Sequence, residues 1–164
     1  VDYGTANPAS FGLWGLLDGV WYRVAERYFD SRKEGWQKTD AEYAADLKEL
    51  AAGRNVQRVI VDPSAASFIE TLRREGFCVA RAVNDVADGI RVTADLLKSG
   101  RIVLCRECGD CLREMEQYCW DERGGRDAPR KENDHAMDDL RYFAMDLAGE
   151  EHGGFAATYV ERRI

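Results

Sequence analysis

The apolar run of residues 59–61 (Val-Ile-Val), which Asp62 follows at once, is the feature that most restricts how this chain can fold. A strand that is apolar on both faces is typical of a central position in a parallel sheet covered by helices on each side. The neighbouring residues 38–52 and 64–75 have the apolar spacing of amphipathic helices, and a glycine follows each of them. The sequence therefore predicts an α/β domain with Asp62 at a strand end.

A long β-hairpin is expected before this strand. Residues 10–17 and 20–29 have the pattern of two strands, and Asp18-Gly19 between them is a dipeptide that favours a type I′ turn. With the segment around Asp2 they predict three antiparallel strands. Further along the chain, strands are predicted at 56–62, 77–82 and 101–105 and helices at 85–99, 106–118 and 134–147. That order predicts a mixed sheet, antiparallel and then parallel, flanked by helices.

The length of 164 residues and the hydrophobic content of 45% fit one compact domain with a substantial core. The chain contains no apolar run of membrane-spanning length. It does not begin with methionine, and a candidate site residue stands at position 2, so we expect a domain from a longer protein. We assign residues 1–148 to that domain and residues 149–164, which are polar and contain glycine, to a C-terminal tail.

Three aspartates stand out because of their places in this pattern. Asp2 precedes a tyrosine and a glycine, Asp62 ends the apolar strand, and Asp138 lies near the start of the last helix. Only tertiary folding can bring these positions together, and divalent cations best relieve the repulsion between converging carboxylates. The pattern is typical of a two-metal site that cleaves phosphodiesters. In simpler alternatives, Asp2 only opens a turn, and Asp62 is only a helix N-cap or a turn residue.

The acids of the last helix leave more than one choice of ligand. Asp134 and Asp138 share one face of that helix, while His135 and Asp139 share another. Asp134 is well placed as the N-cap, and we expect Asp138 to be the third metal ligand. Asp134, His135 and Asp139 remain alternative or additional ligands, and a surface role explains His135 equally well.

The net charge of −7 argues against strong nonspecific binding to nucleic acid, but a local basic patch is compatible with it. The best candidate for a DNA-facing patch consists of four basic residues that precede the last helix: Arg123, Arg126, Arg130 and Lys131. Lys131 is the residue expected to contact a phosphate or to orient the attacking water. A solvated loop, in which the arginines offset nearby acids, accounts for the same residues equally well.

Five cysteines, without a visible secretory signal, indicate a reducing compartment and free thiols. Cys105, Cys108 and Cys111 have a spacing that zinc and iron–sulfur sites also use. Such a site needs a fourth ligand, and the helical spacing of residues 106–118 spreads these side chains around a helix. We therefore favour a structural role for the three cysteines.

Three motifs, in order along the chain, resemble a known family. They are V-D-Y-G at 1–4, V-I-V-D-P-S-A at 59–65 and N-D-H-A-M-D-D-L-R-Y at 133–142. Together they are similar to the ribonuclease H-like fold and, more narrowly, to the C-terminal nuclease domain of the terminase large subunit of tailed bacteriophages and prophages. The third motif is the most specific of the three. Position 139 is usually a small residue in that family, so Asp139 is a departure from the pattern.

The resemblance implies a metal-dependent endonuclease that cuts concatemeric viral DNA during genome packaging, in the cytoplasm of the bacterial host. It implies two Mg²⁺ or Mn²⁺ ions, with Asp2 bridging both, Asp62 holding one and Asp138 the other. The implied partners are double-stranded DNA, an upstream terminase ATPase domain, the small terminase subunit and the portal protein, with no membrane involved. The sequence has no G-x-x-x-x-G-K-[ST] motif, so the motor is expected outside this chain.

Two other classes of function stay open at this level. A ribonuclease H-like module without activity could serve as a docking platform for the packaging machinery. The residues Asp2-Tyr3-Gly4-Thr5 also resemble the first phosphate loop of actin-like and sugar-kinase ATPases, which would make the chain an ATPase fragment. Those proteins need a second glycine-rich phosphate loop and two such domains, and this chain has neither. Metal-dependent cleavage distinguishes the nuclease from the docking module, and nucleotide binding identifies the ATPase.

Overall fold

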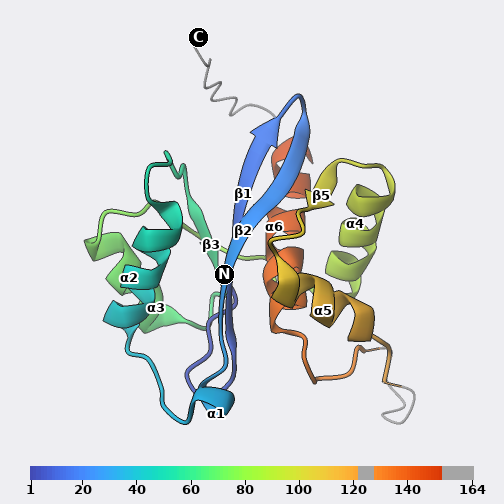
Figure 1. The fold of residues 1–164 in the computed structure, drawn as a ribbon. Coiled ribbons are helices and arrows are strands. Elements are labelled where there is room, and N and C mark those ends of the chain that lie inside the picture. The colour runs from blue at the N-terminus through green and yellow to red at the C-terminus, as the bar shows by residue number, and fades with distance from the viewer. Residues whose placement is uncertain (122–127, 153–164) are drawn as a thin grey trace.

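The computed structural model describes residues 1–121 and 128–152, with side chains as far as residue 150. A hairpin opens the chain, and helices and strands then alternate (Figure 1). The elements are β1 (Ala9–Leu17), β2 (Val20–Phe29), α1 (Ser31–Glu34), α2 (Asp40–Ala51), β3 (Val59–Val61), α3 (Ala66–Arg74), β4 (Val79–Arg81), α4 (Val86–Lys98), β5 (Ile102–Leu104), α5 (Gly109–Gln117) and α6 (His135–His152). The hairpin runs through the middle of the molecule, with α2 and α3 on one side and α4, α5 and α6 on the other (Figure 1).

The hairpin forms where the sequence predicts it. β1 and β2 pair antiparallel from Ala9 and Phe29 to Leu17 and Val20, with one shift of register between Leu13 and Trp14. Asp18 and Gly19 have φ angles of 50° and 79°, and a type I′ turn requires positive φ at both central residues. β2 also pairs in parallel with β5, so this sheet contains both kinds of pairing.

The segment Val1–Asp2 joins the two sheets of the protein. On one side, Asp2 and Ser10 exchange backbone hydrogen bonds of 3.0 and 2.9 Å. On the other side, the Val1 nitrogen donates to the Ile60 carbonyl at 2.6 Å, and the Val1 carbonyl accepts the Asp62 N–H at 3.2 Å. Backbone pairing therefore continues from β5, β2 and β1 through this segment to the parallel pair of β3 and β4.

The predicted fold class, a mixed sheet flanked by helices, is confirmed. The third antiparallel strand predicted around Asp2 is a correction, because Asp2 makes one isolated bridge with Ser10 and no strand. The reason is local, since the chain bends at residues 5–7, directly after this bridge. A short segment is nevertheless enough to hold Asp2 beside the end of β3.

The sheet separates two hydrophobic clusters. On the side of α2 and α3, the rings of Phe11, Tyr43 and Phe68 pack against one another and are at most 2% exposed. On the other side, Leu140 of α6 and Ile102 of β5 belong to the second cluster, where α6 packs against α4. Within the described residues, no helix is both long and apolar enough to cross a membrane.

Helix boundaries follow the prediction in some places and differ in others. Thr39 is the N-cap of α2, just inside the predicted helix start at residue 38, and forms a capping box with Glu42. α5 begins at Gly109 rather than at residue 106, after a turn that the Cys108 N–H closes on the Cys105 carbonyl at 3.0 Å. α6 continues to His152 rather than ending at residue 147, so its last turn enters the predicted tail.

Two of the three clustered cysteines are buried thiols. Burial raises the pKa of Cys108 to about 11 and that of Cys111 to about 12. The Cys108 thiol donates to the Arg23 carbonyl at 3.2 Å. Both side chains are fully buried in the second hydrophobic cluster, where they pack as small apolar groups.

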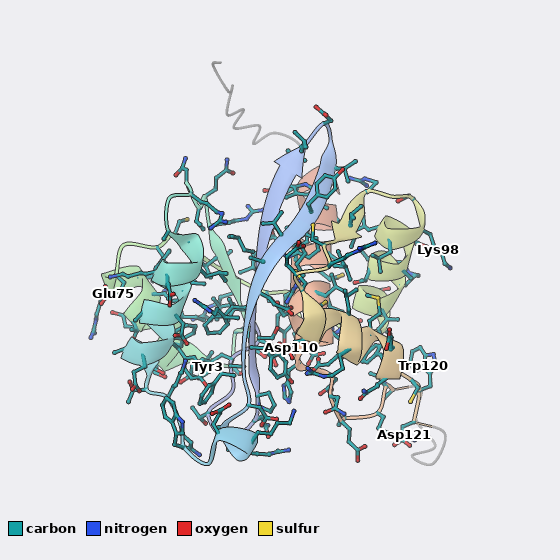
Figure 2. All side chains as sticks on the ribbon, in the orientation of Figure 1. Tyr3, Glu75, Lys98, Asp110, Trp120 and Asp121 are labelled. Atoms are coloured by element: carbon teal, nitrogen blue, oxygen red, sulfur yellow. The ribbon has the colours of Figure 1, made fainter. Side chains whose placement is uncertain are left out.

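A buried ion-pair cluster connects the hairpin to α5 and α6. Arg23 of β2 is fully buried, with Nη1 2.7 Å from Asp139 Oδ2 and Nη2 3.2 Å from Glu26 Oε2. Burial acts to raise the pKa of Asp139, but positive charges, that of Arg23 among them, hold it below its ordinary value. Glu26 Oε1 accepts the Asp110 N–H at 2.7 Å, at the start of α5 where Figure 2 labels Asp110. Every charge in the cluster therefore has a partner, as buried ions require.

Gly12 in β1 lies against this cluster. A Cβ at Gly12 would overlap the Arg23 guanidinium and come within 2.9 Å of Asp139 Oδ2. Gly12→Ala should displace the guanidinium from its partners, and the resulting unpaired buried charge should lower the free energy of unfolding by about 3 kcal/mol. Urea denaturation measures this change.

Gly15→Ala in the same strand is the control, because the nearest atom to its Cβ would be Val24 Cγ1 at 4.0 Å. This variant should change the free energy of unfolding by less than about 1 kcal/mol. Equal stability of the two alanine variants would contradict the packing argument.

Candidate active site

A groove of about 600 Å³ lies where the Val1–Asp2 segment, the end of β3 and the start of α6 come together. Its lining includes Tyr3, which Figure 2 labels near the middle of the molecule, and the basic residues Arg32 and Lys131. Acidic groups are the most numerous in the lining, and with the one histidine they are Asp2, Asp30, Asp62, Glu132, Asp134, His135 and Asp138. The fold thus brings the three aspartates predicted as ligands to one groove.

Asp2 is held in the groove by its backbone bridge and by a histidine. Its Oδ2 lies 2.9 Å from His135 Nδ1, and 12% of the side chain is exposed. Burial raises the pKa of Asp2 to about 6 against the opposing hydrogen bond with His135, and the charge of Asp138 adds to the rise. Burial acts to lower the pKa of His135, but the hydrogen bond and charge of Asp2 raise it above its ordinary value. The pair therefore holds a proton more readily than either group would alone.

Asp62 stands at the end of β3, as predicted, and both of its carboxylate oxygens accept hydrogen bonds. Oδ1 accepts the Ser64 N–H at 2.8 Å, and Oδ2 accepts the Tyr142 hydroxyl at 2.8 Å. Burial acts to raise the pKa of Asp62, but these hydrogen bonds hold it below its ordinary value, so the carboxylate is ionised at neutral pH. The contact with Ser64 is that of a turn residue, so the simpler role considered for Asp62 coexists with its place in the groove.

Tyr142 is a residue of the site that the sequence interpretation missed. It is 1% exposed and donates its hydroxyl hydrogen to Asp62. Burial raises its pKa, and the charges of Asp2, Asp62 and Asp138 raise it further. One buried hydroxyl therefore experiences the charge of all three acids. The signal in the sequence was the spacing of four residues between Asp138 and Tyr142, which places them on the same face of α6.

Asp138 occupies the first turn of α6, where an arginine contacts it. Its Oδ1 accepts a hydrogen bond from Arg141 Nη2 at 2.6 Å, and 17% of its side chain is exposed. Its Oδ2 makes no hydrogen bond within the described residues. One oxygen of Asp138 is thus engaged inside the protein, while the side chain still lines the groove.

The position of this first turn is set from α5. Glu114 is fully buried, and its Oε2 accepts the Ala136 N–H at 2.6 Å. Its Oε1 accepts the hydroxyl of Tyr28 in β2 at 2.5 Å. A carboxylate at a helix N-terminus satisfies an N–H group that has no partner within the helix. Glu114 therefore anchors the start of α6 to the hairpin and to α5.

The structure separates the neighbouring acids of the last helix. Asp139 does not line the groove and belongs to the buried cluster, 2.7 Å from Arg23. Asp134 directly precedes α6, and its carbonyl accepts the Asp138 N–H at 2.8 Å. The Asp134 carboxylate lines the groove 3.6 Å from Lys131 Nζ. Asp134, Asp138 and His135 thus face the groove, whereas Asp139 pairs with an arginine on another side of the helix.

The predicted DNA-facing residues fall in different places. Lys131 lines the groove, and its side chain is 68% exposed. Arg130 is exposed, and its N–H donates to the Cys119 carbonyl at 2.9 Å. Arg123 and Arg126 lie outside the described residues. Arg32 of α1 was not predicted, although it lines the groove and pairs with Asn7.

The chemistry of the groove fits a hard divalent cation. Carboxylate oxygens are the ligands that Mg²⁺ and Mn²⁺ prefer, and Asp2, Asp62 and Asp138 supply them from three elements. The pKa of Asp2 is raised by burial first and by the charge of Asp138 second, and a bound cation would offset both effects. As the side chains stand, no three His, Cys, Asp or Glu groups in the described part of the chain are arranged to hold one ion. Binding would therefore require the three carboxylates to move closer to one another.

Comparison with known proteins places this geometry in a family. Residues 4–147 match the family described as the terminase RNaseH-like domain. The chain belongs to this family. It is 31% identical over 150 residues to the terminase large subunit of Escherichia phage T5, a match that covers 87% of this chain and 33% of that protein. The resemblance inferred from the three motifs is confirmed, and the match removes the basis for the actin-like ATPase hypothesis.

Solved structures of terminases share the fold. The large terminase of a thermophilic bacteriophage, in complex with ATP-gamma-S, is 50% identical with a TM-score of 0.85, over 87% of this chain and 38% of that chain. The nuclease domain of the SPP1 large terminase, with bound Mn, is 22% identical with a TM-score of 0.56, over 89% of this chain and 81% of that chain. This chain thus spans about a third of the T5 protein and of the terminase from the thermophilic phage.

The raised pKa of Asp2 predicts how stability depends on pH. The folded protein keeps a proton on Asp2 that the unfolded chain loses near 3.8, so this stabilisation is complete below 3.8 and is lost as the pH rises through about 6. The raised pKa of His135 acts in the same direction, since its stabilisation is complete below 6.5 and is lost at higher pH. When the pH is raised from 4 to 8 without metal, the free energy of unfolding should fall in wild type. The fall should be about 2 kcal/mol larger than in Asp2→Asn, which lacks the titrating carboxyl.

Urea denaturation in EDTA at both pH values measures this difference. Glu70→Gln, at an exposed acid of α3, is the control and should follow wild type. If Asp2→Asn loses as much free energy of unfolding as wild type over this range, or more, the raised pKa of Asp2 is not the cause of the pH dependence.

Proposed function

We propose that this chain is a metal-dependent endonuclease domain that cuts double-stranded viral DNA during genome packaging, using two Mg²⁺ or Mn²⁺ ions. The observation that carries the proposal is that Asp2, Asp62 and Asp138 line one groove. They are also close enough together that the charge of each raises the pKa of the same residue, Tyr142. The Mn bound to the SPP1 nuclease domain supports a divalent cation in a protein of this fold. We assign Asp2 to both cations, Asp62 to one and Asp138 to the other.

Hydrolysis of a phosphodiester needs a water in line with the leaving oxygen and compensation for the charge that grows on the phosphoryl group. Cations held by the three aspartates would supply the activated water and much of that compensation. The chain's own groups hold the ligands in place, since Tyr142 donates to Asp62 and His135 pairs with Asp2. Lys131 offers a positive charge to the DNA backbone at the edge of the same groove.

The setting of this activity is proposed from the family. An upstream ATPase domain, the small terminase subunit and the portal protein are the proposed partners, and the cytoplasm of the bacterial host is the proposed location. A docking module of the same fold without activity is the second candidate. The observation that favours it is that Asp2, Asp62 and Asp138 each contact a protein side chain, while no three acidic, histidine or cysteine groups of the described residues converge on one point.

Cleavage of supercoiled plasmid, with Mn²⁺, with Mg²⁺ and with EDTA, tests the proposed activity. Asp62→Asn removes a charged ligand, and losing several kcal/mol of transition-state stabilisation should lower the rate at least about 100-fold. Asp95→Asn, at an acid of α4 that is 68% exposed, is the control and should cut like wild type. The absence of cutting by wild type with either metal, at high enzyme and low salt, would overturn autonomous nuclease activity and favour the docking module.

DNA binding tests the role of the basic groove residues. In an Asp62→Asn background, Lys131→Ala and Arg32→Ala should each weaken binding and lower the slope of log affinity against log salt by about 1, because each removes one phosphate contact. Fluorescence anisotropy with a labelled duplex at several salt concentrations measures both effects. Arg74→Ala, at an exposed arginine of α3, should leave the slope as it is. Unchanged slopes in both groove variants would place the DNA elsewhere.

A further inference from the structure

Arg141 belongs to α6, and its guanidinium is buried between α6 and α4. Its side chain is 2% exposed, and α4 packs against α6 at this point. Burying an arginine is costly unless its donors find partners, so its contacts indicate what the fold gains from it. The two outer nitrogens of the guanidinium both bind at the start of a helix.

The two ends of the guanidinium bind different elements. Nη2 donates to Asp138 Oδ1 at 2.6 Å, within α6. Nη1 donates to the backbone carbonyl of Asp85 at 3.2 Å, and Asp85 is the N-cap of α4. A planar fork fixed at both ends has little freedom to rotate. The orientation of the Asp138 carboxylate therefore depends on the position of the start of α4.

Gly89 in α4 gives this side chain its space. A Cβ at Gly89 would lie 3.2 Å from Arg141 Nη1 and 3.3 Å from Arg141 Cδ. These distances are tighter than ordinary van der Waals contact, so a side chain at residue 89 would press against Arg141. The absence of a side chain at Gly89 therefore leaves the room that this position of Arg141 needs.

We propose that Arg141 is a positioning residue that holds Oδ1 of Asp138 and so presents Oδ2 to a divalent cation in the groove. This inference rests on the proposed function, since it gives Asp138 the role of a cation ligand. Partners that orient a metal ligand contribute substantially to affinity, and their loss typically weakens metal binding roughly 10- to 100-fold. Arg141 lines no part of the groove itself and acts only through Asp138.

The sign of one measurement separates positioning from simple charge. A guanidinium beside a cation site repels the cation, so removing its charge should tighten cation binding if Arg141 were only a counter-ion. If Arg141 positions Asp138, removing it should weaken cation binding despite the lost repulsion. Arg141→Met makes this comparison, because methionine keeps an unbranched apolar stem but has neither the charge nor the hydrogen-bond donors.

Isothermal titration of Mn²⁺ into the metal-free chain is the experiment, with thermal unfolding followed by circular dichroism to establish that each variant folds. Arg141→Met is expected to bind Mn²⁺ roughly 10- to 100-fold more weakly than wild type. Arg141→Lys keeps the charge but loses the fork and should also bind more weakly. Gly89→Ala changes no charge and touches no ligand, yet it should weaken binding by displacing the guanidinium. Arg91→Met, at an exposed arginine of α4, is the matched control and should bind like wild type.

The outcomes are distinguishable. Wild type that binds no Mn²⁺, or that binds it as well after Asp138→Asn, overturns the proposed metal site and this inference with it. Wild type that binds through Asp138, with equal or tighter binding in folded Arg141→Met, overturns the inference alone. If Arg141→Met does not fold, Arg141→Lys and Gly89→Ala decide, and wild-type affinity in both overturns the inference.

Discussion

The pairing of Val1–Asp2 with strands on both of its sides is the contact on which the candidate site depends. The hydrogen bonds with Ser10 and Ile60 fix the backbone of Asp2 between β1 and β3. Asp62 follows β3 directly and donates its own N–H to Val1, so two of the three acids are set by one stretch of sheet. The backbone hydrogen bonds of a sheet determine where its side chains point. The positions of Asp2 and Asp62 therefore do not depend on contacts between the carboxylates themselves. The third acid, Asp138, is brought to this edge by the packing of α6.

Features that depend on neighbouring residues could be predicted from the sequence. The Asp18-Gly19 turn and the Thr39 cap are local, and Asp62 at a strand end follows from the apolar run before it. The partners of the acids could not be predicted, because they are distant in the chain. Tyr142 reaches Asp62 across 80 residues, and this contact exists only after α6 packs on the sheet.

Position 139 illustrates the same limit. The sequence identifies Asp139 as a departure from the family's small residue, and its proximity to Asp138 leaves the two acids hard to distinguish. In the structure Asp139 pairs with Arg23, 116 residues away, and Gly12 leaves the space for that pair. A buried carboxylate at this place is tolerated because the hairpin supplies both the opposite charge and the room. Arg23, Asp139 and Gly12 therefore depend on one another, and the role of Asp139 cannot be inferred from position 139 alone.

The caps of the last two helices have a consequence for how the domain assembles. Glu26 of the hairpin accepts the Asp110 N–H at the start of α5, and Glu114 of α5 accepts the Ala136 N–H at the start of α6. Neither cap comes from the residues immediately before its helix. The start of α5 is therefore complete only when the hairpin packs against it, and the start of α6 only when α5 does. The first turn of α6, which carries Asp138 and His135, therefore depends on the packing of both the hairpin and α5. A local opening at either of these contacts would free this turn, and two of the side chains that line the groove would lose their support.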